Sequence, residues 1–311
     1  MIHFTLPTVL DQPGGPPKQA NHNRPSTNPD VTNQPCSPEN IVFYSAGTGK
    51  YHYPRHETPH LLVANFRHTG HYVLNNRPIT ASDHHFYMLN EGDRLEIDFR
   101  EELPLQTFLV LFGRSFILDA LYFLSAPALQ LLEYPLNDHL QEFPIPSVPF
   151  SMNAILKQQL YSLIAPAPAA GPTENILLNI LTVFYPLLKH TSSRLQNIQA
   201  VKRSTREELY QRLFVAQEFM QDNSSEDLTL GRIAAIACLN KFHFLSIFKE
   251  LHHTTPHQYM IALRLEKAYG ILKSRQSTVT ETCYAVGFKS QASFSHLFKK
   301  KFGIPPSALL K

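Results

Sequence analysis

The sequence predicts an α+β chain in which a β-rich N-terminal domain with flanking helices precedes an all-α C-terminal domain. Three observations lead to this prediction. Short apolar runs separated by turn residues occupy positions 41–112, apolar residues at helical spacing occupy much of 114–189, and one helix-turn-helix pattern occurs twice in 228–310. With 311 residues, 43% of them hydrophobic, the chain is long enough for two domains and a tail.

Residues 1–40 have the composition of a disordered, proline-rich tail. They include eight prolines and many Asn, Gln, Ser and Thr, with few apolar residues after Leu10. Such a segment buries too little apolar surface to offset the entropy lost on ordering, so we expect it to remain disordered. The alternative is an upstream extension added by an over-long gene prediction. The first 15 residues lack a basic stretch before an apolar one, so we expect no secretory signal.

Positions 41–112 are predicted to form a small antiparallel barrel or sandwich. Polar turns such as Thr69-Gly70 and Asn75-Asn76 separate short runs that are apolar or alternating, as in closely spaced antiparallel strands. The predicted strands are Ile41–Tyr44, Leu61–Arg67, Tyr72–Leu74, Phe86–Leu89, Leu95–Phe99 and Thr107–Phe112.

A helical pattern follows from 114 to 189, interrupted by a Pro/Ala-rich linker at 165–172. The last helix has a broad apolar face that includes Leu177, Leu181 and Phe184. We expect this face to pack on the β-rich domain, with a dimer interface as the alternative. The predicted helices are Phe116–Leu124, Ala128–Leu132, Met152–Ile164 and Glu174–Leu188.

A polar segment, 191–203, is predicted to link the two domains. Ser204 and Glu207 then have the spacing of a capping box, which opens a helix that runs to about Met220. These boundaries assign 41–190 to the N-terminal domain and 204–311 to the C-terminal domain.

The C-terminal domain contains the same supersecondary unit twice, at Leu228–Met260 and Thr278–Leu310. Each copy begins at a threonine that can cap a helix, continues through a short apolar helix and a tight turn, and ends its second helix in a Phe-Lys step. A proline follows shortly after each second helix. This is the pattern of a helix-turn-helix, whose second helix enters the DNA major groove.

The segment RLEKAYGILKSRQSTVTETCYAVGFKSQASFSHLFKKKFGIPPSAL resembles the DNA-binding domain of AraC/XylS-type transcription regulators. The resemblance covers about a third of the chain, roughly 204–310, and the tandem arrangement makes it more specific than a single helix-turn-helix. Its strongest pieces are Ala285-Val286-Gly287-Phe288, Ser293-Phe294-Ser295, Phe298-Lys299, Phe302-Gly303 and Pro306.

This resemblance implies a sequence-specific DNA-binding transcription regulator that responds to a small-molecule effector. It implies a cupin-like β-barrel at 41–190 that senses the effector and dimerises, and a tandem helix-turn-helix domain at 204–311. Members of the family more often activate than repress, so we expect an activator. The implied partners are double-stranded operator DNA, RNA polymerase, the effector and a second copy of the chain.

The first recognition helix is predicted at Asn240–His252. The residues on or beside its open face are Lys241, Phe242, His243, Leu245, Ser246 and Lys249. By resemblance, Phe242, Leu245 and Ser246 occupy positions that reach base edges. Leu245 offers only apolar contact, for example to a thymine methyl, and its alternative is to pack inside the domain.

The second recognition helix is predicted at Ser290–Phe302. Gln291 can bond an adenine edge, and Ser295 and His296 can each reach a single acceptor on the same face. Lysines at both ends are predicted to contact phosphates, which position the helix without reading sequence. The candidate DNA-binding residues of this copy are Lys289, Ser290, Gln291, Ser293, Ser295, His296, Lys299 and Lys300.

Three further residues raise alternatives. Cys238 and His253 stand where members of the family often have glycine, at a turn and a helix stop, so they require either strain or a different turn. Arg264 lies in the helix that connects the two copies, where an arginine is more often structural, and it could pair with Glu266 or Glu250.

The charge distribution favours a nucleic-acid partner for the C-terminal part only. From position 200 onward the chain has 16 Lys/Arg and 9 Asp/Glu, a net charge of +7, whereas the remainder has a net charge of −4. Three cysteines, Cys36, Cys238 and Cys283, are widely spaced, which fits a reducing compartment. No apolar run reaches the ~18–20 residues of a membrane span, so we expect no membrane partner. The resemblance to DNA-binding regulators implies a cytoplasmic, nucleoid-associated protein.

We expect no enzymatic activity, no cofactor and no metal. The sequence has no nucleophile elbow, P-loop or paired carboxylates. The rival hypothesis is a metal-dependent cupin enzyme fused to a DNA-binding domain, because seven histidines crowd positions 52–85. The H-x-H and Glu spacing of a cupin metal site is absent, so exposed or structurally bonded histidines are the expectation.

Overall fold

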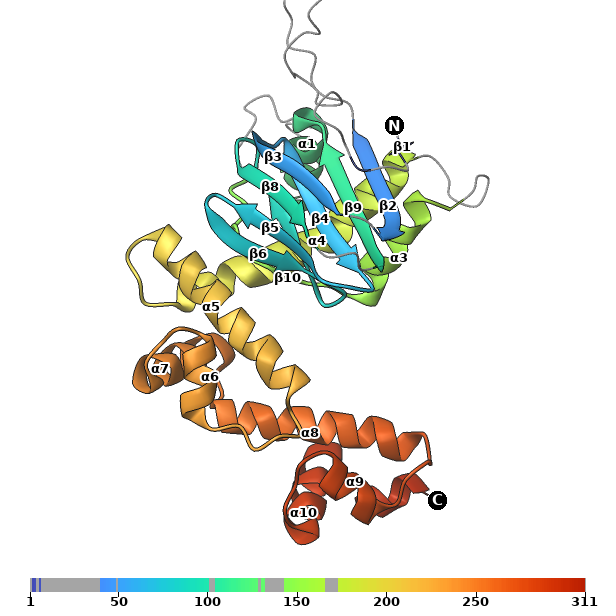
Figure 1. Cartoon of the computed structure of the whole chain (residues 1–311), viewed down its shortest axis with the longest axis vertical. Coiled ribbons are helices and arrows are strands. Elements are labelled where there is room, and N and C mark those ends of the chain that lie inside the picture. Colours follow the sequence, from blue (N-terminus) through green and yellow to red (C-terminus); the bar gives the residue numbers. More distant parts are fainter. Residues whose placement is uncertain are drawn as a thin grey trace, which may run out of the picture. The chain divides into compact units, whose positions relative to one another are not determined.

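A computed structural model describes residues 2–3, 6, 40–48, 50–100, 104–127, 130–131, 143–165 and 173–310. The chain divides into two compact units, Met1–Ser192 and Ser193–Lys311 (Figure 1). The first contains the sheets and the second is helical, so the fold is mixed α+β as the sequence predicts.

The larger of two sheets in the first unit has six strands. All neighbours in it are antiparallel except the first pair, which is parallel. In spatial order the strands are β1 (Ile2–His3), β2 (Ile41–Thr48), β9 (Pro104–Phe112), β4 (His60–Phe66), β7 (His85–Leu89) and β10 (Phe150–Ser151).

The smaller sheet has four antiparallel strands. In spatial order they are β3 (Tyr51–Glu57), β8 (Arg94–Phe99), β5 (Gly70–Leu74) and β6 (Arg77–Ala81). Pro54 and Pro78 lie in β3 and β6, and both strands are at the edges of this sheet. The sequence patterns missed these two strands because proline argues against a strand interior, but an edge strand tolerates it.

Alternate residues along the central strands point into two separate cores. Leu61 and Val63 of β4 belong to a cluster that draws on both sheets, with Tyr72 and Ile97 opposite them. Leu62, between them, belongs to a second cluster on the other face of the six-stranded sheet.

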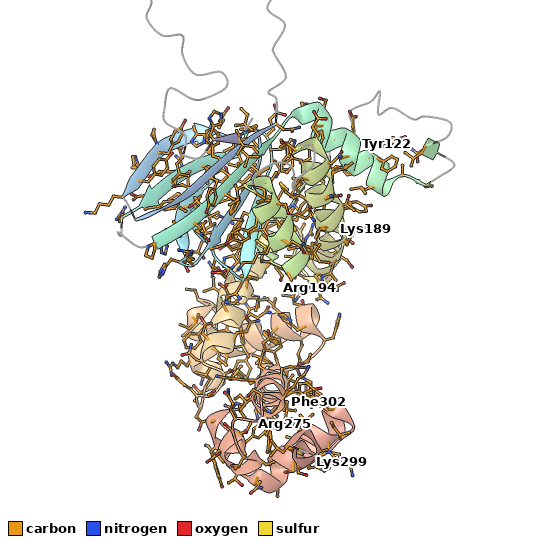
Figure 2. All side chains as sticks on the ribbon, turned by 90° about the vertical axis from the view of Figure 1, so that its right-hand side faces the viewer. Tyr122, Lys189, Arg194, Arg275, Lys299 and Phe302 are labelled. Carbon is orange, nitrogen blue, oxygen red and sulfur yellow. The ribbon has the colours of Figure 1, made fainter. Side chains whose placement is uncertain are left out.

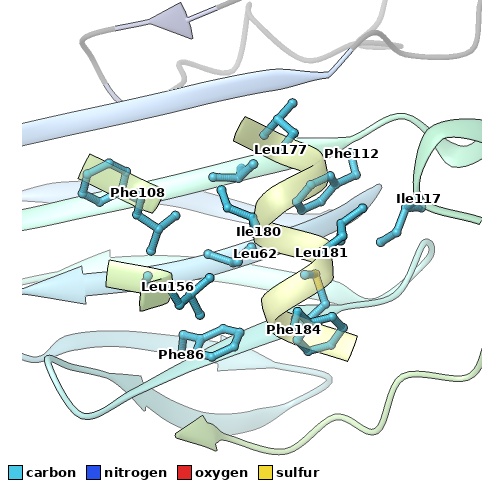
Figure 3. Packing of buried hydrophobic residues seen from close by; sticks show 14 of the residues in the cluster. Leu62, Phe86, Phe108, Phe112, Ile117, Leu156, Leu177, Ile180, Leu181 and Phe184 are labelled. Carbon is cyan, nitrogen blue, oxygen red and sulfur yellow. The ribbon is translucent and has the colours of Figure 1, made fainter. Parts of the chain in front are cut away.

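Three helices cover that second face. They are α1 (Arg114–Ser125), α3 (Ala154–Leu163) and α4 (Thr173–Asn197). The sequence predicts this packing for the last of them, the apolar helix expected at Glu174–Leu188. Figure 3 shows Leu177, Ile180, Leu181 and Phe184 of α4 beside Leu62 of the sheet. Burial of each such side chain contributes roughly 1.5–3 kcal/mol to stability.

Four expectations need correction. The described strands form two sheets and no closed barrel. Ile2 and His3 are not disordered: they pair with Val42 and Phe43, and the His3 ring stacks on Phe43 at 4.9 Å. The rest of the predicted tail, apart from Leu6 and Asn40, lies outside the described residues, as does most of the predicted helix 128–132.

The other two corrections concern the predicted linker, 191–203. Helix α4 continues to Asn197, so only residues 198–202 separate it from α5 (Arg203–Asp222). The capping box at Ser204 does not form, because the helix begins one residue earlier with Lys202 as its N-cap. Arg203 Nε donates to Glu207 Oε1 at 2.7 Å, an i,i+4 pair that uses the carboxylate the box would have required.

The second unit consists of helices around two aromatic cores. After α5 they are α6 (Leu230–Ile236), α7 (Lys241–His252), α8 (Pro256–Lys273), α9 (Val279–Ala285), α10 (Gln291–Phe302) and a 3-10 helix, η2 (Pro306–Leu310). Among the described residues, no single helix is long and apolar enough to span a membrane. The pair α6–α7 meets that criterion only when both helices are taken together, and they bend by 81°.

Candidate nucleic-acid interface

The first helix-turn-helix is formed by α6 and α7, and Thr229 is the N-cap of α6, as the sequence predicts. Thr229 Oγ1 accepts a hydrogen bond from the Arg232 amide at 3.2 Å, and Asn240 Oδ1 accepts from the His243 amide at 2.9 Å. These side chains satisfy amides that have no partner within the helix. The caps therefore fix the residues at which α6 and α7 begin, and the two helices meet at an angle of 81°.

The second helix-turn-helix is formed by α9 and α10. Thr278 and Glu281 form a complete capping box: the Thr278 hydroxyl accepts from the Glu281 amide at 3.2 Å, and the Glu281 carboxylate accepts from the Thr278 amide at 2.9 Å. The bond to the Thr278 amide lowers the pKa of Glu281. Ser290 caps α10 through the Ser293 amide at 3.4 Å.

The recognition helix α7 buries one face and exposes the other. Phe244, Ile247, Phe248 and Leu251 are buried. Most of its candidate residues are exposed, namely Lys241, Phe242, His243, Ser246 and Lys249. Phe242 is 86% exposed, which is unusual for a phenylalanine and places an apolar ring on the surface beside the lysines.

Leu245 and Ser246 are less free than the other candidates on α7. Leu245 is half-buried and lines a cavity of about 260 Å³ with Ile233, Met260 and Ile261. The Ser246 hydroxyl donates to Glu250 Oε1 at 3.2 Å, so a carboxylate lies on the same exposed face.

The recognition helix α10 has the same pattern with a more polar surface. Phe294 and Phe298 are buried and Ser295 is half-buried. In Figure 2, Lys299 lies at the outer edge of α10. The exposed candidates are Ser290, Gln291, Ser293, His296, Lys299 and Lys300.

Two of the polar candidates in the second copy already have partners. Gln291 Oε1 accepts from the Thr280 hydroxyl at 3.4 Å. Lys289 Nζ lies 2.7 Å from Asp227 Oδ2, with both side chains about 80% exposed. That pair lowers the pKa of Asp227, and DNA would compete with Asp227 for the lysine.

Arg264 has a structural role, as expected from the sequence, but with partners other than the suggested carboxylates. Its guanidinium donates to three backbone carbonyls, those of Ser224 at 2.7 Å, Glu226 at 2.7 Å and Gly287 at 2.9 Å. It does not use the carboxylates of Glu250 or Glu266. Glu266 pairs instead with Lys301 at 2.9 Å.

The histidines at positions 52–85 do not form a common site. His52 lies 3.8 Å from Asp98, His56 Nδ1 lies 3.0 Å from the Pro54 carbonyl, and His85 bonds to Thr80 and Ser82. His60 is buried at the start of β4, and burial lowers its pKa. Within the described ranges, no three His, Cys, Asp or Glu residues are grouped so that they could hold a metal ion.

Comparison with known proteins agrees with this geometry. A helix-turn-helix domain family matches residues 233–311, which include α7 to α10. The MmsAB operon regulatory protein of Pseudomonas aeruginosa is 38% identical over 90 residues, 29% of this chain and 29% of its own. The C-terminal unit is a helix-turn-helix domain similar to those of transcription regulators.

Other relatives of the AraC-type domain are more distant. The probable transcriptional regulator LumQ of Photobacterium leiognathi is 25% identical over 158 residues, 51% of this chain and 60% of its own. An AraC-type transcriptional regulator from Chromobacterium violaceum is 27% identical, with a TM-score of 0.31, and the match covers 32% of this chain and 88% of that structure. The chain thus spans between about a third and three fifths of the curated relatives named here.

Proposed function

We propose that this protein is a sequence-specific DNA-binding transcription regulator that places α7 and α10 in major grooves of operator DNA. The observation that carries the proposal is the tandem pair of capped helix-turn-helix units. Each presents a 12-residue helix with a buried aromatic face and an exposed polar face. A single exposed helix is common in proteins, whereas two capped helix-turn-helix units in tandem are far more specific to DNA-binding domains.

In this proposal the exposed residues of the two helices have different roles. Gln291 and His296 reach base edges from α10, and Phe242 contacts a thymine methyl from α7. Lys241, Lys249, Lys299 and Lys300 contact phosphates, which hold the helices in place on any sequence. Leu245 supports the fold of the first copy rather than base contact, because it is half-buried and lines a pocket with Ile233, Met260 and Ile261.

For the first unit we propose a cupin-like module that senses a small-molecule effector and dimerises. Its support is the pair of sheets that share a core, with helices covering the other face of the six-stranded sheet, placed before an AraC-type domain. The protein then acts in the bacterial cytoplasm on the nucleoid, as an activator that contacts RNA polymerase. Equilibrium sedimentation and a screen of small molecules by thermal shift test the dimer and the effector separately.

Selection of duplexes from a random library with the full chain tests DNA recognition directly. We expect the selected duplex to bind roughly a thousandfold or more tightly than a scrambled duplex at physiological salt. Affinity for both should fall linearly with the logarithm of salt concentration, because phosphate contacts release counterions. Equal affinity for the two duplexes at every salt concentration would contradict the proposal.

A matched pair of lysine variants provides the control. Lys300→Gln should weaken binding to both duplexes about equally and reduce the salt slope by about one unit. Lys50→Gln removes the same charge from an exposed position in the first unit and should leave both affinities unchanged.

A further inference from the structure

The guanidinium of Arg264 joins the two helix-turn-helix copies. Arg264 lies in the middle of α8, the helix between the copies. Two of its hydrogen bonds go to Ser224 and Glu226, in the loop between α5 and α6 that leads into the first copy. The third goes to Gly287, in the turn of the second copy. One side chain therefore holds a loop and a turn that are about 60 residues apart in the chain.

Close backbone packing reinforces this connection between the α5–α6 loop and the turn of the second copy, which we call the Arg264 joint. Gly287 has φ +92°, and a Cβ placed there would lie 2.4 Å from the Ser225 carbonyl oxygen. The turn of the second copy therefore packs directly on the loop of the first. Lys267, one turn beyond Arg264 on α8, donates to the Ser225 hydroxyl at 3.1 Å. The Lys289–Asp227 pair joins the same turn and loop at the surface.

We propose that Arg264 is a positioning residue that fixes the distance and rotation between the two recognition helices, and thereby the spacing of the two DNA elements they read. The inference rests on the proposed function, since spacing has meaning only if both helices bind DNA. In this proposal Arg264 itself contacts neither the bases nor the phosphates.

The chemistry of the joint requires arginine in particular. A guanidinium is planar and presents five N–H donors in a rigid fork, so Nε, Nη1 and Nη2 can each serve a different carbonyl. A lysine ammonium has its donors on one atom and cannot reach three separated oxygens at once. Burial lowers the pKa of Arg264, but an arginine starts so far above neutrality that it remains charged.

DNA geometry makes the separation of the helices measurable. Two recognition helices on one face of B-DNA lie about 34–36 Å apart, one turn of roughly 10–10.5 base pairs. One inserted base pair rotates the second element by about 34–36° and moves it by about 3.4 Å. A rigid joint cannot follow that change, whereas a loosened joint can follow part of it.

The experiment compares three duplexes in titrations with the full chain: the selected duplex, the same duplex with one base pair inserted between its two elements, and one intact element beside scrambled sequence. We expect the insertion to weaken wild-type binding by roughly tenfold or more, comparable to a mismatch in the site. Arg264→Lys should reduce that penalty to about threefold or less and leave the single-element duplex within about twofold of wild type. Arg264→Gln should have the same effect, more strongly.

Two further variants separate position from stability. Lys273→Gln removes an equal charge from an exposed site on the same helix and should keep the full spacing penalty. Gly287→Ala should also reduce the penalty, because it forces the turn away from Ser225 without altering Arg264. A wild-type spacing penalty in Arg264→Lys would overturn the proposal, as would an equal loss on the single-element duplex. Absence of sequence preference in the wild-type chain would instead reject the proposed function.

Discussion

The two helix-turn-helix copies reach the same backbone geometry with different residues. Left-handed backbone occurs at the turn and at the end of the recognition helix in both. The first copy uses Cys238 (φ 53°) and His253 (φ 54°), and the second uses Gly287 (φ 92°) and Gly303 (φ 76°). Gly287 packs against the Ser225 backbone, whereas a Cβ at Gly303 would meet nothing within 4 Å. The comparison shows that a residue with a side chain can adopt the left-handed backbone at these positions. Glycine is required only where the backbone packs closely against another segment, as at Gly287.

A second difference lies in the aromatic cores beneath the recognition helices. In the first copy His252 stacks on Phe248 at 4.3 Å and lies 5.5 Å from Tyr259 of α8. In the second copy Phe302 takes the corresponding place, 4.7 Å from Phe298 and 4.8 Å from Tyr269 of α8. A titratable ring therefore replaces a phenyl ring in the core of the first copy only.

The largest effect is expected from Gly287→Ala. A Cβ there combines left-handed strain with contact against the Ser225 carbonyl, so the free energy of unfolding should fall by about 3 kcal/mol. Urea unfolding of the full chain, followed by circular dichroism of its helical transition, measures this loss. Gly303→Ala is the control and should cost only about 1 kcal/mol, because it carries the strain without the contact. Equal losses would show that packing at Gly287 adds nothing.

Acid should destabilise the first copy more than the second. Burial, reinforced by Arg194 and His253, lowers the pKa of His252 from 6.5 to about 3. Arg194 Nη2 donates to His252 Nδ1 at 3.2 Å, a bond that needs the neutral ring. Because the folded pKa lies below the unfolded one, this stability is complete above pH 6.5 and declines as pH falls toward 3. At pH 5 the loss should be about 2 kcal/mol.

His252→Phe, which copies the second unit, is the matched variant. Its free energy of unfolding should fall less between pH 7 and pH 5 than that of the wild type, because the contribution of His252 is gone. Urea unfolding at both pH values measures the difference. His243→Gln removes an exposed histidine from the same helix and should retain the wild-type pH dependence. An unchanged pH dependence in His252→Phe would exclude His252 as its source.

Base discrimination should be stronger in the second copy. Gln291→Ala should cost roughly 1–3 kcal/mol on the selected duplex and little on scrambled DNA, because an adenine edge loses a bidentate partner. Leu245→Ala should lower thermal stability instead, since Leu245 is half-buried among Ile233, Met260 and Ile261. Titrations of the two duplexes decide the matter. If Leu245 or Ser246 variants lose more sequence selectivity than Gln291→Ala does, the first copy is the stronger base reader and this ranking is reversed.

The smallest effect is expected from giving the first copy the glycines of the second. Cys238→Gly and His253→Gly relieve left-handed strain but make the unfolded chain more flexible, so each should change stability by about 1 kcal/mol or less, in the stabilising direction. Thermal unfolding of each variant measures the change. A clear loss of stability would mean that the side chains of Cys238 or His253 contribute contacts that outweigh their backbone strain.

Local signals predicted the C-terminal unit well. Thr229 and Thr278 cap the helices that the sequence assigns to them. The recognition helices begin one residue later than predicted, with Asn240 and Ser290 as their N-caps. A cap needs only a side-chain oxygen and an amide three residues away, so nearby sequence contains the whole interaction. The failed box at Ser204 shows the limit, because the helix begins one residue earlier and Arg203 pairs with the Glu207 carboxylate that the box would have used.

Interactions between distant segments were much less predictable. The three bonds of Arg264 end on backbone carbonyls, which every residue has and no sequence pattern marks. The Lys289–Asp227 pair joins residues 62 positions apart. In the first unit the sheets followed from alternation, but β3 and β6 were missed because their prolines are acceptable only at an edge that folding creates.

The Arg264 joint has a consequence for exchange of halves between regulators. Its hydrogen bonds go to main-chain oxygens, so the loop side chains of Ser224 and Glu226 could vary without removing them. A chimera that replaces residues 278–310 with the corresponding segment of another tandem domain should therefore dock correctly, provided that segment supplies glycine at position 287. New pairs of DNA elements could then be combined at an unchanged spacing, by recombination rather than by redesign of the contact.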